Sequence, residues 1–198
     1  VWDNGPGWTR NQIAPIIYVP DIPGGVYRTS NYMVPGAGDL PSDAIASGQA
    51  LWIYANAPGA SMSINEQAKT TITGNFYREK RKDVNPVLKL SISHANVTDN
   101  AFIILHPEAS RGYDVKFDGL KLEGETLGIS ISVDNANWVM YAVDAFEENE
   151  ELPLSVKTTE GDAYELSFES LDGFELTPWK VYDRKERQFV NLSSSSKY

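Results

Sequence analysis

The 198-residue chain has no cysteine, and this absence excludes disulfides, thiol nucleophiles and zinc–thiolate sites. Histidine is almost as scarce, because His94 and His106 are the only two. A Ser–His–acid triad needs a histidine held between an acid and a nucleophile, and neither histidine lies in such a motif. The sequence also lacks a G-x-S-x-G nucleophile elbow. We therefore expect a protein that is not an enzyme, and we predict no catalytic residue.

Long apolar runs and an excess of positive charge are missing as well. No run approaches the ~20 apolar residues of a membrane-spanning helix, so we expect no membrane span. The 27 acidic and 17 basic residues give a net charge of −10. Because a phosphate polymer or an anionic bilayer would repel such a chain, we expect no nucleic-acid partner. The hydrophobic fraction of 41% is sufficient for a real core and argues against disorder.

What the sequence does contain is apolar alternation with a period of two, which is typical of strands. Gly, Pro, Asn and Asp separate the alternating runs and indicate turns. Helix is limited to a turn or two within 65–71 and 143–151. Strands are predicted within residues 12–20, 24–32, 50–55, 61–65, 75–79, 87–93, 101–106, 127–133, 137–143, 152–158, 163–169, 179–183 and 188–192. This pattern predicts an all-β fold of β-sandwiches with little helix.

One composition shift divides the chain. Charged residues fill Arg78 to Asp83, and Pro86 follows; we interpret this stretch as a solvated connector, although a basic site is the alternative. It separates an N-terminal β domain, residues 1–83, from a second domain, residues 84–198. The second has the size of an immunoglobulin-like sandwich, about 100 residues. Because Val1 opens directly on a turn-rich loop, we expect an excised piece, with the first domain truncated at its start and the second lacking its last strand.

Aromatic residues are the main candidates for ligand binding. The 5 Trp and 10 Tyr could supply rings that stack on sugars, although aromatics in sandwiches are more often core residues. Trp2, Trp8, Tyr27 and Tyr32 lie in the loop-rich first part and are the predicted ligand-binding residues. Surface glycans are the corresponding candidate partner.

Oxygen-rich segments are the only candidates for a metal. Residues 144–152 (DAFEENEEL) carry the hard oxygen ligands that Ca²⁺ prefers, but they lack the D-x-D-x-D-G spacing of a calcium loop. Asp134, Asn135 and Asn137 could also be oxygen ligands, but a tight turn between two strands explains them more simply. A pair of carboxylates suited to glycoside hydrolysis has no specificity among 27 acids. We therefore predict no cofactor and no metal ligand, with Ca²⁺ as the one ion left open.

The segment SGQALWIYANAP, Ser47 to Pro58, combines an apolar run with polar loops on both sides. A continuous apolar run is typical of a strand that is buried on both faces. Since Leu51 and Ile53 flank Trp52, we predict that Trp52 fills a core.

Several of these segments also resemble a known family when they are taken in order. The order begins with GWTRNQIAPIIYVPD and IASGQALWIYANAPGASMSINEQAKT and continues with FYRE and VLKLSISHANVTDNAFIILHPEAS; later parts include WVMYAV, LPLSVKTTEGDAYELSFESLDGF and KVYDRKERQFVNL. This order resembles a recurrent β-sandwich region of large secreted Bacteroidota proteins. In them, the region precedes the C-terminal sorting domain of the type IX secretion system. Two departures are the missing Asn-Pro-Tyr-Pro-like start and the missing sorting domain after Tyr198.

The resemblance implies export across the outer membrane and a place on the cell surface or outside the cell. It implies as partners the neighbouring domains of the same parent protein and the secretion or surface-attachment machinery. It supplies no catalytic residues. The expected function is a non-catalytic structural or adhesive region, in which a free sheet edge would accept a strand from a neighbouring module or chain. The alternative is a carbohydrate-binding module of a secreted polysaccharide-degrading protein.

Overall fold

The computed structural model describes residues 2–21, 25–34, 36–46, 48–70, 85–122, 124, 126–158, 163–171, 173–176 and 178–192. Their regular elements are strands and two single-turn 3₁₀ helices, which confirms the predicted all-β class. The first part contains β1 (Trp8–Asn11), β2 (Ile13–Asp21), β3 (Val26–Asn31), η1 (Pro41–Asp43), β4 (Trp52–Ala55), β5 (Ser61–Ile64) and η2 (Glu66–Ala68). The predicted strand at 75–79 and the charged connector, apart from Asn85 and Pro86, lie outside the described residues.

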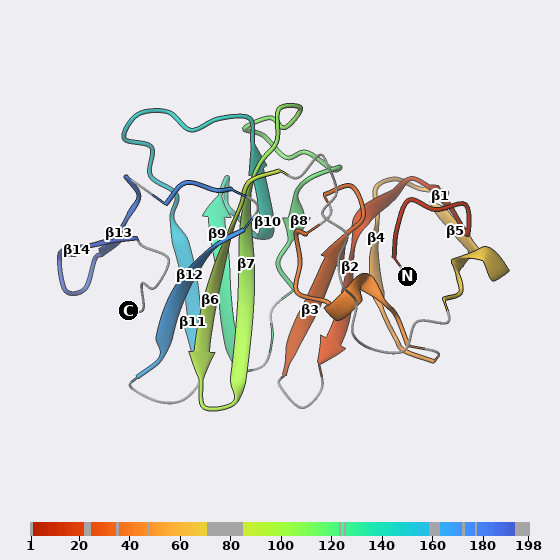
Figure 1. The fold of residues 1–198 in the computed structure, drawn as a ribbon, viewed down its shortest axis with the longest axis horizontal. Helices are drawn as coiled ribbons and strands as arrows, with labels where there is room; N and C mark the ends of the chain where they lie inside the picture. The colour runs from red at the N-terminus through yellow and green to blue at the C-terminus, as the bar shows by residue number, and fades with distance from the viewer. Residues whose placement is uncertain are drawn as a thin grey trace.

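In the second part, the described residues form nine further strands, most of which are labelled in Figure 1. They are β6 (Val87–His94), β7 (Val97–Leu105), β8 (Gly119–Leu120), β9 (Leu127–Val133), β10 (Ala136–Val143), β11 (Leu154–Thr158), β12 (Glu165–Leu171), β13 (Lys180–Asp183) and β14 (Gln188–Asn191). The alternating runs therefore located most strands correctly. They missed β1 and β8, which are too polar or too short to show a period of two.

The two predicted helical turns had different outcomes. Within 65–71, η2 forms, and the Asn65 side chain accepts a hydrogen bond from the Gln67 N–H as an N-cap does. Within 143–151, the prediction was wrong, because the residues after β10 form turns instead. The acidic side chains in this second segment lie on a loop between two strands.

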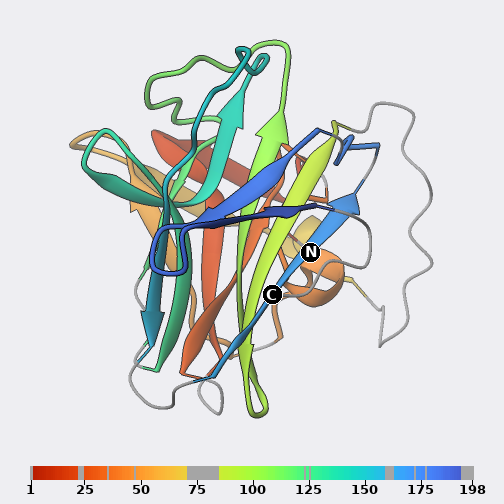
Figure 2. The ribbon, with the colours of Figure 1, turned by 90° about the vertical axis from the view of Figure 1, so that its left-hand side faces the viewer.

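The largest sheet has the strand order β11-β9-β10-β7-β6-β12, and β8 also pairs with β10. Strand β10 changes partner along its length. Trp138 lies opposite both Ile131 of β9 and Leu120 of β8, whereas Met140 lies opposite Phe102 of β7 and Gly119 of β8. Because a strand has only two edges, β8 must pair with one edge of β10, and β9 and β7 must share the other edge. On that shared edge, β9 pairs with the first residues of β10 and β7 pairs with the last ones. The sheet therefore folds into two layers at β10 (Figure 2).

A hydrophobic core fills the space between these two layers. Alternate residues of each strand point inward, as the period of two requires. Leu90 of β6 and Ile103 of β7 meet Ile129 of β9 and Phe168 of β12, and all four are buried. These layers packed face to face form a β-sandwich; an immunoglobulin-like topology for this region remains a proposal.

The other face of β7 and β10 is buried as well. There Phe102 and Met140 pack against Ile16 and Tyr18 of β2, which belongs to the three-stranded sheet β3-β2-β4. The Tyr18 hydroxyl also donates to the Leu120 carbonyl at 2.7 Å. One hydrophobic cluster therefore joins residues on both sides of the predicted 83/84 boundary. The division into two domains stays a prediction.

Strand β2 is the doubly buried strand of the first part. Its residues Ile17 and Val19 point away from β7 and pack in a third cluster with Trp2. The two-stranded ribbon β1-β5 contributes Trp8 and Met62 to this cluster.

The prediction that Trp52 fills a core was wrong. Strand β4 pairs with β2 at the margin of the three-stranded sheet, and the Trp52 side chain is 59% exposed. Leu51 and Ile53 do pack inward, in the cluster with Ile17. The apolar run of β4 therefore buries only one face.

Candidate functional site

Three of the four predicted ligand-binding aromatics lie together. Trp2 is only 1% exposed, and its indole N–H donates to the Pro15 carbonyl at 2.7 Å. The Trp8 ring centroid lies 4.8 Å from that of Trp2, and the Tyr32 centroid lies 5.5 Å from it, both edge to face. We call Trp2, Trp8 and Tyr32 the closed aromatic cluster.

The side chain of Arg10 occupies the centre of the closed aromatic cluster. Its guanidinium carbon lies 4.2 Å from the ring centroids of Trp2 and Tyr32 and 5.0 Å from that of Trp8, which are cation–π distances. Its Nη2 donates to the Asp3 carbonyl at 2.6 Å, and burial lowers the Arg10 pKa. A sugar could stack between these rings only by displacing Arg10.

Tyr27 lies apart from the closed aromatic cluster. It is on β3, half-buried, opposite Pro20 of β2, and it packs against the cluster that contains Tyr18. The structure thus brings together Trp2, Trp8 and Tyr32 but not Tyr27. Ligand binding by these four residues stays a prediction.

Polar side chains fasten the three-stranded sheet to the larger one. The Arg28 guanidinium pairs with Asp21 at 2.8 Å and with Asp39 at 3.0 Å, and it donates to the Thr98 carbonyl at 3.2 Å. The Asn100 amide donates to the same Asp39 carboxylate at 2.7 Å. These bonds link β3 to the β7 strand across the shared hydrophobic cluster.

A second polar contact lies deeper, where β7 meets β9. Lys121 Nζ lies 2.5 Å from an Asp99 oxygen, and the two side chains are 3% and 2% exposed. The Ile129 N–H donates to the same oxygen at 2.8 Å. Burial raises the Asp99 pKa against the opposing effect of Lys121. Because removal of one partner would leave a buried charge unpaired, this pair ties the segment after β8 to the sandwich.

A large groove of about 1530 Å³ lies at the end of the sandwich away from β2. Strands β11 and β12, the two ends of the strand order, and the hairpin β13-β14 all contribute to it. Its apolar lining includes Leu105, Phe146, Leu154, Val156, Leu166 and Trp179. In Figure 2 the hairpin, in dark blue, passes in front of the layer that contains β6 and β7. We call this feature the strand-edge groove.

Opposite charges line the rim of the strand-edge groove. Glu147, Glu148 and Glu151 come from the loop after β10, whereas Lys180 and Lys185 belong to the β13-β14 hairpin. An extended peptide with an apolar face would bury that face in the groove and leave its polar side chains at the rim.

The acidic loop at residues 144–152, the candidate for Ca²⁺ binding, is partly neutralised by the side chain of Arg111. Arg111 Nη1 lies 2.5 Å from Glu150, and Arg111 Nε lies 3.7 Å from Glu147. Throughout the described ranges, no group of three or more histidine, aspartate or glutamate side chains could hold a metal ion. Calcium binding stays open.

The tight turn predicted at Asp134 and Asn135 is confirmed. Both residues have positive φ angles, 53° and 59°, and they connect β9 to β10. Two consecutive positive φ angles are typical of a type I′ hairpin turn, in which Asn and Asp are favoured. This turn explains the two residues without a metal.

Sequence reasoning missed a second group of aromatics. Tyr54 of β4 and Tyr113, from the loop before β8, are 47% and 51% exposed, and Trp52 lies beside Tyr54 on the same strand. The exposure of Trp52 and Tyr54 follows from the position of β4 at a sheet margin, which no local pattern showed. The alternation in WIYA did place Trp52 and Tyr54 on one face.

Comparison with known proteins identifies one family. A family described as "Domain of unknown function (DUF8693)" matches residues 23–196, a range that crosses the predicted domain boundary. No curated protein and no solved structure matches the chain. In the part of the chain that the structure describes, no helix is long and apolar enough to cross a membrane.

Proposed function

We propose, from the premise that the chain belongs to the DUF8693 family, that it is a non-catalytic structural or adhesive β-sandwich region of a large secreted cell-surface protein. The proposal includes export by the type IX secretion system. It takes as partners the neighbouring domains of the parent protein and the machinery that secretes or attaches it. The sequence resemblance supports the location, and the layered sheets support the structural role.

The strand-edge groove is the observation that carries this role. Leu154 and Val156 of β11 and Leu166 of β12 line a space of about 1530 Å³. Among the residues that the structure describes, β11 pairs with β9 alone and β12 pairs with β6 alone. An exposed strand edge next to an apolar groove is suited to β-strand addition. We infer that a strand from a neighbouring module of the parent protein occupies the groove.

Light scattering over a concentration series tests this role on the chain itself. With no neighbouring module present, the strand-edge groove should bind a strand of a second copy and give an oligomer whose share rises with concentration. Val156→Lys should abolish the oligomer, because it places a charge in the apolar groove. Glu148→Lys, which changes a rim charge only, is the matched control.

A protein that stays monomeric throughout the series and resists limited proteolysis at β11 and β12 would contradict the strand-accepting role. The location has a separate test. Protease treatment of intact producing cells should remove the region if it is displayed on the surface, and it should leave an internal marker protein intact.

The alternative function, carbohydrate binding through Trp2, Trp8, Tyr27 and Tyr32, stays a prediction. Tryptophan fluorescence titrated with soluble polysaccharides tests it. Substitution of Trp8, which is half-buried, should then weaken binding.

A further inference from the structure

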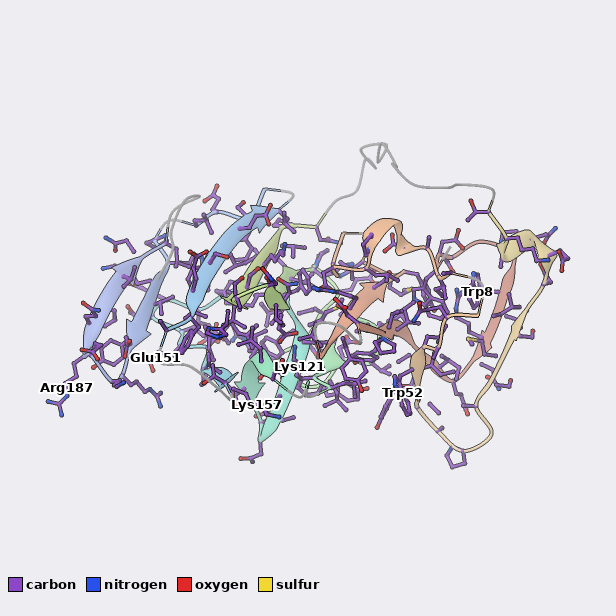
Figure 3. The ribbon with its side chains drawn as sticks, turned by 90° about the horizontal axis from the view of Figure 1, so that it is seen from below. Trp8, Trp52, Lys121, Glu151, Lys157 and Arg187 are labelled. Atoms are coloured by element: carbon purple, nitrogen blue, oxygen red, sulfur yellow. The ribbon has the colours of Figure 1, made fainter. Side chains whose placement is uncertain are left out.

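Three large aromatic side chains form an exposed surface that is separate from the closed aromatic cluster. Trp52, Tyr54 and Tyr113 are 59%, 47% and 51% exposed. Trp52 and Tyr54 lie two residues apart on β4 and share a face of that strand. Tyr54 and Tyr113 border the same small dimple. We call these three residues the aromatic platform; Figure 3 shows Trp52 at the outer margin of the molecule, beside β4.

One ring of the aromatic platform, that of Tyr113, is held in place by its neighbours. The Tyr113 ring stacks on the buried Trp138 with centroids 5.2 Å apart and an interplanar angle of 21°. Trp138 is itself fixed, because its indole N–H donates to the Val133 carbonyl at 3.2 Å. Trp52 lies directly opposite Tyr18 of β2 in the sheet. Rings fixed before binding lose little conformational freedom when a ligand stacks on them.

Tyr54 and Tyr113 line a small dimple whose lining is mostly apolar and whose one carboxylate is that of Asp118. Its volume is about 10 Å³, which is roughly the room that one water molecule or one hydroxyl needs. Asp118 and Gly119 line it. A Cβ on Gly119 would come within 2.6 Å of the Ile16 side chain, so the absence of a side chain there allows the close packing around the dimple.

The Asp118 carboxylate is aligned by two backbone donors. The N–H of Asp114 and the N–H of Ala142 each donate to one of its oxygens at 2.8 Å. Each carboxylate oxygen can accept more than one hydrogen bond, so capacity remains for a donor in the dimple. Burial raises the Asp118 pKa to about 7, against the effect of these two bonds.

We propose that the aromatic platform binds a neutral saccharide. The C–H face of a pyranose would stack on the exposed rings, and one sugar hydroxyl would enter the dimple and donate to Asp118. Ligand sites typically combine aromatic walls with a few fixed polar groups in this way. The net charge of −10 disfavours anionic glycans.

The size of the surface favours a sugar over a protein partner. A stable protein interface buries about 800 Å² on each partner, whereas the aromatic platform consists of three side chains around a space for one hydroxyl. The platform also lies apart from the strand-edge groove, which β11 to β14 form (Figure 1). The saccharide site therefore does not depend on the structural role proposed above.

Affinity electrophoresis in gels that contain soluble laminarin, xylan, galactomannan or hydroxyethyl cellulose tests the saccharide site. We expect at least one of these neutral polysaccharides to retard the wild-type chain. Trp52→Ala and Tyr113→Ala should each weaken that retardation at least about fivefold, because each variant removes one of the aromatic rings on which the sugar would stack. Circular dichroism should show that both variants remain folded, since both side chains are exposed.

Phe189→Ala is the matched control, because Phe189 is 69% exposed but lies on the β13-β14 hairpin. It should retain wild-type retardation. The proposal is overturned if none of the four polysaccharides retards the folded wild type, or if Trp52→Ala and Tyr113→Ala bind as well as Phe189→Ala does. Self-association that Trp52→Ala abolishes would also overturn it, because the platform would then be a protein interface.

Discussion

The closed aromatic cluster and the aromatic platform contain similar side chains but differ in what covers them. Around Trp2, the β1-β5 ribbon adds a layer, and Arg10 fills the remaining space. Over Trp52, 59% of the side chain stays exposed. Aromatic content therefore does not identify a ligand site in this chain. The deciding factor is whether the chain supplies a further layer over the rings.

Of the substitutions that compare the two groups of aromatics, Trp2→Ala should have the largest effect on stability. Removing a fully buried tryptophan leaves a cavity and a carbonyl of Pro15 without its donor, so we expect a loss of about 3–5 kcal/mol in the free energy of unfolding. Urea unfolding followed by circular dichroism measures it. A loss below about 1 kcal/mol would mean that the closed aromatic cluster contributes little to the core.

The next largest effect is the dependence of stability on pH that Asp118, beside the aromatic platform, should cause. Asp118 has a folded-state pKa of about 7, raised chiefly by burial, against an ordinary value of 3.8. Between about pH 4 and pH 7 the native state therefore holds this proton more tightly than the unfolded state does. Stability from this group should fall as pH rises through that range, on the order of 4 kcal/mol in total, and should change no further above it.

Asp118→Asn isolates this contribution. An amide accepts at its oxygen only, so one of the two backbone N–H donors loses its partner and the variant should be less stable overall. Its stability should nevertheless depend less on pH than that of the wild type between pH 4 and pH 7. Asp99, whose pKa is also raised, contributes with the same sign to both proteins and does not affect the difference. Parallel pH profiles would contradict the assignment to Asp118.

Arg10→Ala should have a smaller effect than Trp2→Ala. The guanidinium gains cation–π attraction from the surrounding rings, but burial opposes its charge, as its lowered pKa shows. We expect Arg10→Ala to lower the free energy of unfolding in urea by about 2 kcal/mol, the value of a desolvated cation–π interaction. Arg10→Met, which keeps most of the side-chain volume, should lower it less. If Arg10→Met were as destabilising as Arg10→Ala, the charge rather than the packing would dominate.

Trp52→Ala should have the smallest effect on stability, within about 0.5 kcal/mol of the wild type, because the side chain is mostly in solvent. It should also remove a tryptophan that acrylamide quenches readily. Trp2→Phe, by contrast, should leave acrylamide quenching nearly unchanged. If Trp52→Ala and Trp2→Phe reduced acrylamide quenching equally, Trp2 and Trp52 would be equally exposed, and the comparison would be wrong.

The sequence predicted local structure well and exposure poorly. The alternation in residues 127–133 and 137–143 located β9 and β10, and Asp134 and Asn135 marked the turn between them. Trp2 was a candidate for exposure because it lies in a loop-rich segment, yet it is buried. Trp52 was a candidate for burial because apolar residues flank it, yet it is exposed. Both depend on contacts with residues distant in sequence.

The sequence by itself determined the all-β class, most strand positions and the face on which each strand residue lies. These properties follow from a period of two and from turn residues, which act between neighbours in the chain. Only the tertiary structure decided that β10 joins two layers, that Arg10 enters the closed aromatic cluster and that Tyr113 lines the same dimple as Tyr54. The physical reason is that exposure depends on which elements pack together, and that packing is a sum over distant contacts that no local pattern contains.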